Sequence, residues 1–286
     1  MRQYRVVSRV AGLILATATA VTTVAHPTAS AQEAADYEAA GQALVSLSSM
    51  SAGSDYQPGD PYSPPADGGQ TPPKKEKRFR YHNSSDWRFL ERGDFVTPGS
   101  KLHTDTGSCS AGFFVTANGR AYMIWAGHCA DVGEQVYWRN PEGTEVLLGE
   151  TVWSKNDDTD DLALVDITHT RAPIRPNIQL VDDRFGGVVN LRQEGLHTDD
   201  LLICRLGYRT GISCGDFDGV YQNSRKFTSY APADHGDSGG PVFILKGTTW
   251  YPVGVVSGGW DSEPDIGSAA EIAQLVKAWN LVFYTG

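Results

Sequence analysis

The chain of 286 residues is long enough for one large or two ordinary domains, and 40% of its residues are hydrophobic, which excludes wholesale disorder. Its formal net charge of −10 argues against non-specific binding to nucleic acid or to an anionic membrane surface. The 31 glycines exceed the usual share of about 7% and favour a turn-rich, all-β chain. Composition therefore argues against a disordered chain and against a non-specific binder of nucleic acid or anionic membranes, but it does not indicate a function.

Residues 1–31 have the three parts of a secretory signal peptide. Three arginines in the first nine residues form a basic start, residues 11–25 form an apolar stretch, and residues 29–31 (ASA) give the small-residue cleavage pattern. The apolar stretch is shorter than the roughly 20 residues that a membrane-spanning helix needs. We therefore expect a secreted protein without a membrane anchor, in a compartment where its cysteines can pair.

Residues 32–92 are interpreted as a pro-segment or a disordered linker. The stretch 53–73 is rich in Pro, Gly and Asp and has no apolar periodicity, which is typical of an extended linker. The basic run that follows, Lys74–Arg80 (KKEKRFR), is either a solvated part of this linker or a cleavage site that releases a pro-segment. We expect part of residues 32–92 to be removed after export.

From residue 93 to residue 286, short apolar stretches alternate with turn residues at a spacing of roughly ten residues. Dipeptides such as Asn-Gly between these stretches predict β-hairpins in a sandwich or barrel. Only the end of the chain has helical periodicity. Four apolar residues from Ile272 to Trp279 fall at i, i+3, i+4 and i+7 and predict a helix at about 269–282.

Two local patterns contain candidate catalytic side chains. His128 stands in the segment Trp125–Cys129 (WAGHC), at the end of an apolar strand. Asp161 begins the apolar strand Asp161–Val165 (DLALV). Each pattern is weak by itself, because a lone histidine is more often structural and the acidic stretch 156–161 could equally be a surface loop or a loose cation site.

A third pattern, Gly236–Pro241 (GDSGGP), is more specific. Glycines on both sides of Ser238 allow a tight backbone that exposes the serine Oγ and directs successive N–H groups at one point. An acyl-transfer nucleophile and its oxyanion hole require that geometry.

The order of these residues along the chain discriminates between hydrolase folds. Gly236-x-Ser238-x-Gly240 also fits the nucleophile elbow of α/β-hydrolases, but that fold needs its catalytic histidine after the serine, and none of the seven histidines follows Ser238. The subtilisin order, with Asp before His, does not fit His128 and Asp161. The order His128, Asp161, Ser238 is that of chymotrypsin.

Together with Cys204–Gly215 (CRLGYRTGISCG) and Val253–Gly259 (VGVVSGG), these motifs resemble those of the chymotrypsin-fold, or trypsin-like, serine proteases. They are most similar to the bacterial secreted streptogrisin and α-lytic type, over about residues 93–284. The resemblance implies an all-β fold of two six-stranded antiparallel Greek-key β-barrels, at about 93–175 and 185–268, followed by the C-terminal helix. The catalytic residues would lie in the crevice between the barrels.

The resemblance also implies roles for the candidate residues. His128 would act as general base and then as general acid, Asp161 would orient it, and Ser238 would form an acyl-enzyme. The N–H groups of Gly236 and Ser238 would form the oxyanion hole. Substrate backbone would pair with the strand that contains Ser257, Gly258 and Gly259.

Specificity and activation depart from the trypsin pattern. Pro232 stands where trypsin-like enzymes carry an acidic determinant, so cleavage after Arg or Lys has no support. Gly258 and Gly259 would leave the walls of the P1 pocket without side chains, which favours a large apolar or aromatic P1 residue. His235 is a further candidate for substrate contact.

Activation is a separate question. In animal relatives a newly cut N-terminus pairs with the residue before the serine, here Asp237. In this chain Arg92–Val96 (RGDFV) only resembles the start of bacterial mature chains.

Trp125 occupies the position before Ala-Gly-His at which the family usually has threonine, and the sequence offers no interpretation of this change.

Four cysteines allow three disulfide connectivities, and their spacing lacks the closely spaced pair that a four-cysteine zinc site uses. The resemblance implies the pairs Cys109–Cys129 and Cys204–Cys214. We expect no metal or other cofactor, a polypeptide substrate, no nucleic-acid partner and a monomer. Two alternatives stay open: a catalytically idle binding or surface protein of the same fold, and an esterase that uses the same three residues.

Overall fold

The computed structural model describes residues 79–178, 184–193, 201–247, 249–260 and 263–284. The expected signal peptide and most of the predicted pro-segment lie outside the described residues. Among the residues that are described, no helix has the length and hydropathy needed to cross a membrane.

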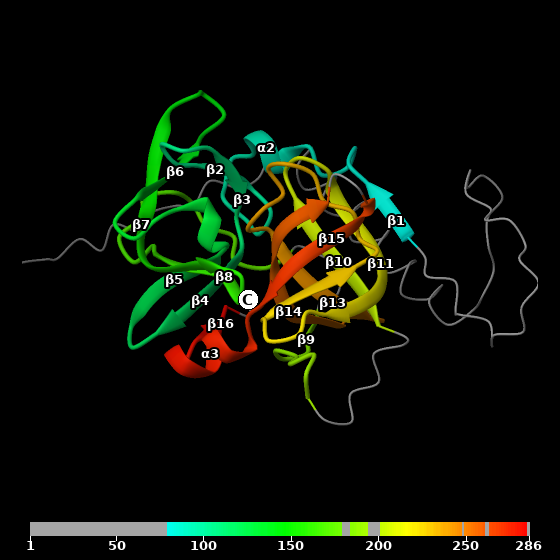
Figure 1. Ribbon diagram of the computed structural model, residues 1–286. Coiled ribbons are helices and arrows are strands. Elements are labelled where there is room, and N and C mark those ends of the chain that lie inside the picture. The colour runs from blue at the N-terminus through cyan, green and yellow to red at the C-terminus, as the bar shows by residue number, and fades with distance from the viewer. Residues whose placement is uncertain (1–78, 179–183, 194–200, 248, 261–262, 285–286) are drawn as a thin grey trace, which may run out of the picture.

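Most of the N-terminal half of the described chain, together with β16 from the C-terminal end, forms one curved sheet (mainly green in Figure 1). Its eight strands are β2 (Lys101–His103), β3 (Ser108–Ser110), β4 (Phe113–Ala117), β5 (Arg120–Trp125), β6 (Gln135–Arg139), β7 (Glu145–Asp157), β8 (Asp160–Asp166) and β16 (Val282–Phe283). They follow the order β16-β4-β5-β8-β7-β6-β2-β3, and no pairing within the described chain joins β16 to β3. This sheet is therefore an open half-barrel.

Most of the C-terminal half, together with β1 from the start of the described chain, forms a second sheet (mainly yellow to orange in Figure 1, with β1 in cyan). Its strands are β1 (Phe79–Asn83), β9 (Arg184–Phe185), β10 (Leu202–Gly207), β11 (Gly211–Val220), β12 (Lys226–Ser229), β13 (Pro241–Lys246), β14 (Thr249–Trp260) and β15 (Glu263–Glu271). Because β12 pairs with both β15 and β11, strands β10 to β15 close into a six-stranded barrel. The predicted all-β double-barrel architecture is confirmed, with one barrel closed and the other half open.

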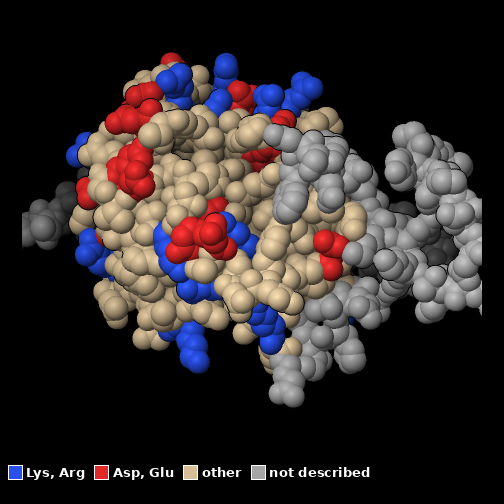
Figure 2. All heavy atoms as spheres, viewed as in Figure 1, with Lys and Arg blue, Asp and Glu red and all other residues tan. Residues whose placement is uncertain are grey.

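The two sheets share a large hydrophobic core, and a second, smaller cluster lies within the C-terminal sheet. Phe113 of β4 stacks on Trp250 of β14 with ring centroids 6.1 Å apart, and both rings are buried. Burial of apolar area of this kind holds the sheets in a fixed relation, so side chains at their junction are held in position. On the face in view, acidic side chains are interspersed with basic ones over the N-terminal sheet (Figure 2).

The C-terminal helix is shorter than predicted. Ala269–Glu271, expected to be helical, belong to β15 because they pair with β14 and β12. Helix α3 (Ala273–Trp279) ends where Asn280 adopts the left-handed conformation at φ 49° and donates its N–H to the preceding turn. Residues 282–283 then form β16 against β4. An apolar stripe predicts a helical face, but it does not exclude strand pairing at either end.

Residues 79–92, predicted to be part of a linker or pro-segment, are ordered and pack on the barrels. β1 pairs antiparallel with β11, and the short helix α2 (Phe89–Arg92) follows it. Trp87 and Leu90 are 1% and 2% exposed and belong to the shared core. The boundary predicted between residues 92 and 93 therefore does not coincide with a break in the structure.

Both predicted disulfides are present. Cys109–Cys129 joins β3 to the short 3-10 turn η1 (Gly127–Cys129) that follows β5. Cys204–Cys214 joins directly opposite residues of β10 and β11. These pairs use all four cysteines, which excludes a zinc site made of cysteine thiolates.

Candidate functional site

His128 and Asp161 are joined by a direct hydrogen bond at the junction of the two sheets. His128 Nδ1 lies 2.8 Å from Asp161 Oδ2, and the backbone N–H of His128 donates to Asp161 Oδ1 at 2.8 Å. The hydroxyl of Ser257, on β14 of the other sheet, donates to Asp161 Oδ2 at 2.5 Å. Asp161 is 2% exposed, so these three donors surround a buried carboxylate.

The electrostatics of Asp161 determine the tautomer of the histidine. Burial raises the pKa of Asp161, but the hydrogen bonds from His128 and Ser257 and the nearby His128 charge outweigh it, so the pKa lies below its usual value. An ionised carboxylate only accepts hydrogen bonds, so Nδ1 carries the proton. In the neutral ring, Nε2 is then free to accept a proton.

Two routes of hydrogen bonds and covalent bonds connect Ser238 to this pair. The Ser238 carbonyl accepts the N–H of Ser110 at 2.8 Å, and the disulfide beside Ser110 leads to Cys129, the residue after His128. On the other side, Gly239 N–H donates to the Val256 carbonyl at 2.7 Å, next to Ser257. Both routes connect the backbone at Ser238 to the elements that carry His128 and Asp161.

No hydrogen bond in the described structure joins Ser238 Oγ to His128. Such bonds often tighten only when substrate is bound.

Two backbone N–H groups beside Ser238 have no partner within the described structure. Asp237, Gly239 and Gly240 donate their N–H groups to carbonyls at 3.0, 2.7 and 3.0 Å. The N–H groups of Gly236 and Ser238 donate to nothing among the described residues. These two groups are therefore available to an anionic ligand atom.

Gly236 cannot be replaced by a larger residue in this conformation. Its φ is +102°, and a Cβ there would lie 2.5 Å from the hydroxyl oxygen of Tyr208. Only glycine combines that backbone with this close approach.

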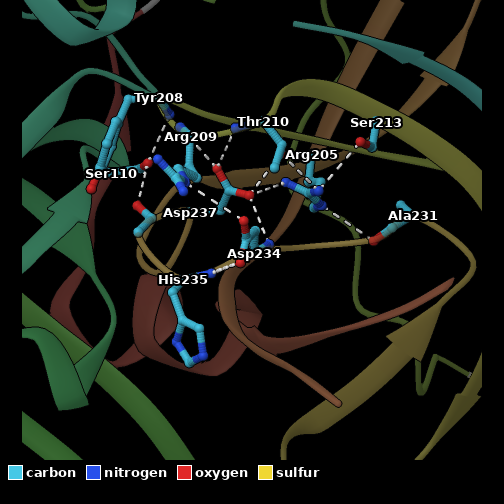
Figure 3. A network of polar contacts seen from close by, with 11 residues as sticks. Ser110, Arg205, Tyr208, Arg209, Thr210, Ser213, Ala231, Asp234, His235 and Asp237 are labelled. Atoms are coloured by element: carbon cyan, nitrogen blue, oxygen red, sulfur yellow. Dashed lines mark hydrogen bonds and ion pairs between the residues drawn. The ribbon is translucent and has the colours of Figure 1, made fainter. Parts of the chain in front are cut away.

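The carboxylate of Asp237 is the centre of a buried network (Figure 3). Its Oδ2 lies 3.0 Å from Arg205 Nη1 and accepts the Thr210 hydroxyl at 2.7 Å and the Asp234 N–H at 2.9 Å. Its Oδ1 accepts the N–H groups of Arg209 and Thr210 at 3.2 and 3.1 Å. This carboxylate therefore holds the loop before Ser238 and the turn after β10 together.

Arg205 is the site residue that sequence reasoning missed. It is 3% exposed, and its guanidinium also donates to the Ala231 carbonyl at 3.2 Å and to Ser213 Oγ at 3.2 Å. Burial lowers the pKa of Arg205 below its usual value, and Asp237 opposes this shift. Asp237 is thus paired with a cation that the closed barrel itself supplies. The signal available in the sequence was a single arginine inside the apolar strand LICRLG.

We expect Arg205→Met to lower the free energy of unfolding by roughly 3–5 kcal/mol, because it leaves the Asp237 carboxylate buried without a cation. Arg209→Met is the matched control, since the Arg209–Asp234 pair is 3.6 Å apart and both side chains are more than half exposed; a cost below about 1 kcal/mol is expected there. Urea unfolding measures both, and equal costs for the two variants would contradict the prediction.

The predicted substrate-binding residues lie at two places. Ser257, Gly258 and Gly259 line a groove of about 400 Å³ together with Asp158, Tyr221, Gln222, Ser224, Lys226 and Ser268. A Cβ at Gly258 would meet no atom within 4 Å, so there is open space on its side-chain side. The strand pairs with β15 here, and its pairing with β13 ends at Val255. His235 is exposed, and its N–H donates to Asp234 Oδ1 at 2.7 Å while its ring points away from the network (Figure 3).

Trp125, whose role the sequence did not explain, is fully buried. It lies behind residues 230–240, the loop between β12 and β13 that contains Ser238 and is called the serine loop below. Its indole N–H donates to the Ser110 carbonyl at 2.7 Å. A Cβ at Gly239, whose φ is +81°, would lie 2.2 Å from the indole nitrogen.

No family model matches the chain. Among solved structures, the chain is similar to protease A of Thermobifida fusca, with 24% sequence identity, a TM-score of 0.51, and coverage of 67% of this chain and 99% of that one. It is also similar to a glutamic-acid-specific serine protease described as using a histidine triad in substrate binding, with 20% identity, a TM-score of 0.50, and coverage of 66% and 100%. The chain therefore has the chymotrypsin-like double-barrel fold of the bacterial serine proteases, the fold that its motifs predict.

Proposed function

We propose that the chain is a secreted serine endopeptidase that hydrolyses peptide bonds through an acyl-enzyme intermediate. The observation that carries this proposal is the Asp161–His128 pair together with a glycine-framed serine, Ser238, whose own N–H and that of Gly236 have no partner among the described residues. A base that is oriented by a carboxylate, a nucleophile and a preformed anion site are the parts that acyl transfer needs.

Each step follows from these groups. Ser238 Oγ attacks the scissile carbonyl while His128 Nε2 takes its proton, and Asp161 stabilises the imidazolium that forms. The oxyanion of the tetrahedral intermediate accepts hydrogen bonds from the N–H groups of Gly236 and Ser238. His128 then returns the proton to the leaving amine. Water next attacks the acyl-enzyme carbonyl while His128 takes its proton, and His128 gives that proton to Ser238 Oγ as the acid product leaves.

The substrate is proposed to be a polypeptide that adds a strand along Ser257, Gly258 and Gly259, which line the groove and lie beyond the last residue of β14 that pairs with β13. We propose a large apolar or aromatic P1 residue and contact with His235, which is exposed beside the loop. Two disulfides support export to an oxidising compartment. We also propose that residues 1–31 are a signal peptide, that part of residues 32–92 is removed after export, and that the protein is a monomer.

Labelling of the secreted protein with a fluorophosphonate probe tests this function. We expect labelling of the wild type and none of Ser238→Ala, while Ser85→Ala, which removes an exposed serine hydroxyl, labels as the wild type does. Casein digestion and a peptide library then report peptide-bond cleavage and the P1 residue.

Labelling without any peptide cleavage would contradict the endopeptidase and favour an esterase. No labelling of the wild type would favour a catalytically idle binding protein. Arg, Lys or Glu dominant at P1 would contradict the proposed specificity.

A further inference from the structure

Ser110, on β3 of the half-barrel, directs every one of its hydrogen-bonding groups at the serine loop and its support. Its N–H donates to the Ser238 carbonyl at 2.8 Å, and its hydroxyl donates to the Gly236 carbonyl at 2.9 Å. The same hydroxyl accepts the Tyr208 N–H at 3.0 Å, beside which Figure 3 shows it. Its carbonyl accepts the indole N–H of Trp125 at 2.7 Å. The Ser110 side chain is fully buried, so each bond forms away from water.

The carbonyls that Ser110 holds alternate with the two unpartnered N–H groups. The carbonyl of Gly236 and the N–H of Asp237 form one peptide plane, held by Ser110 at one end and by the Asp234 carbonyl at the other. The carbonyl of Ser238 and the N–H of Gly239 form a second plane. Ser110 holds its carbonyl end, and the Val256 carbonyl of β14 accepts its N–H. The Ser238 N–H lies in the plane between these two, and the Gly236 N–H lies in the plane that precedes them. Holding the two planes therefore limits the directions in which the neighbouring N–H groups can point.

Trp125 anchors Ser110 from behind. It ends β5, three residues before His128, and is fully buried, with its indole nitrogen directly against Gly239. The Trp125 side chain therefore contacts Ser110, which holds the serine loop, while strand β5 leads into the turn η1 that contains His128. The indole gives the Ser110 carbonyl a partner that no other described residue supplies.

We propose that Ser110 and Trp125 are positioning residues that aim the N–H groups of Gly236 and Ser238 at the oxyanion. This inference rests on the proposed peptidase function and adds to it a device built from the opposite sheet. Neither residue touches substrate. They act by pre-orienting donors, so their effect falls on the transition state and not on substrate binding.

The test uses the full chain and four variants. Ser110→Ala removes the hydroxyl that holds Gly236, and Trp125→Phe removes the indole N–H but keeps an aromatic ring. Ser100→Ala is the matched control for the first, since it is a buried serine whose hydroxyl accepts the N–H of Thr97. Trp87→Phe is the matched control for the second, because the buried indole N–H of Trp87 has no hydrogen-bond partner.

The second-order rate of fluorophosphonate labelling and the kinetics of peptide hydrolysis are measured for all five proteins. We expect Ser110→Ala to lower the labelling rate and kcat by roughly 10- to 100-fold with KM unchanged, and Trp125→Phe to lower them by roughly 3- to 10-fold, both below the loss from deleting a donor outright. Inhibition by phenylboronic acid, which forms a tetrahedral adduct, is expected to weaken by similar factors. Both controls are expected to stay within twofold of the wild type.

The two proposals fail in distinguishable ways. A wild type that labels and cleaves, with Ser110→Ala and Trp125→Phe labelling within twofold of it, would overturn the positioning role and leave the peptidase intact. Equal losses in the variants and their matched controls, or a rise in KM with kcat unchanged, would overturn it as well. A wild type that neither labels nor cleaves would overturn the proposed function and this inference with it.

Discussion

Ser238→Ala is expected to lower kcat for peptide hydrolysis by a factor on the order of 10⁶, and Asp161→Asn by a factor on the order of 10⁴. The serine supplies the nucleophile, so its loss removes the covalent path entirely. The asparagine would retain the shape of Asp161, but its amide cannot stabilise the imidazolium and can favour the wrong ring tautomer through the bond that now joins Oδ2 to Nδ1.

These losses are expected to be strongly non-additive, because the three residues act as one unit. His128→Ala should cost about as much as Ser238→Ala, and the triple variant little more than either alone. His169→Ala and Asp131→Asn serve as controls, since both side chains are exposed and stand outside the site. Initial rates on a peptide p-nitroanilide at substrate saturation measure each kcat. Additive losses, or full activity in Asp161→Asn, would refute the assigned roles.

A chain that begins at Gly93 is expected to be at least about 5 kcal/mol less stable than one that begins at Phe79, or to fail to fold. The shorter chain loses Trp87, Phe89 and Leu90 from the core, and each buried side chain of this size contributes roughly 1.5–3 kcal/mol. It also loses β1, which pairs with β11 of the closed barrel.

A maturation cut is therefore expected N-terminal to Phe79 and not at residue 93. Residues 93–96 only resemble the start of bacterial mature chains, and a cut at residue 93 would strip a segment that fills the core. A cut N-terminal to Phe79 leaves that segment in place. N-terminal sequencing of the active secreted protein and urea unfolding of the two truncated chains measure this. Leu90→Ala in the full chain is expected to be destabilising, and Arg88→Ala, at an exposed neighbour, is expected to be near neutral. Equal unfolding midpoints for the two truncated chains would contradict the prediction.

Much of the fold was accessible from local signals. Short apolar stretches and turn dipeptides predict strands and hairpins whatever surrounds them, because side-chain alternation and positive φ are properties of a few neighbouring residues. The glycine frame of Ser238 is a signal of the same kind, since Gly236 and Gly239 do adopt positive φ. The start of the C-terminal helix could not be predicted from local signals. Ala269 and Ala270 are compatible with both a helix and a strand, and in the structure they pair with β12 and β14.

By itself, the sequence determined the strand-rich architecture, the order of the histidine, aspartate and serine motifs and, through family resemblance, the two disulfides. Only the tertiary structure decided that residues 79–92 belong to the barrels, that Arg205 neutralises Asp237, and that Ser110 and Trp125 support the serine loop. The physical reason is sequence separation. Ser110 bonds to a carbonyl 126 positions away and Arg205 to a carboxylate 32 positions away. No local pattern encodes such partners, because burial and pairing across the two sheets bring them together only in the folded chain.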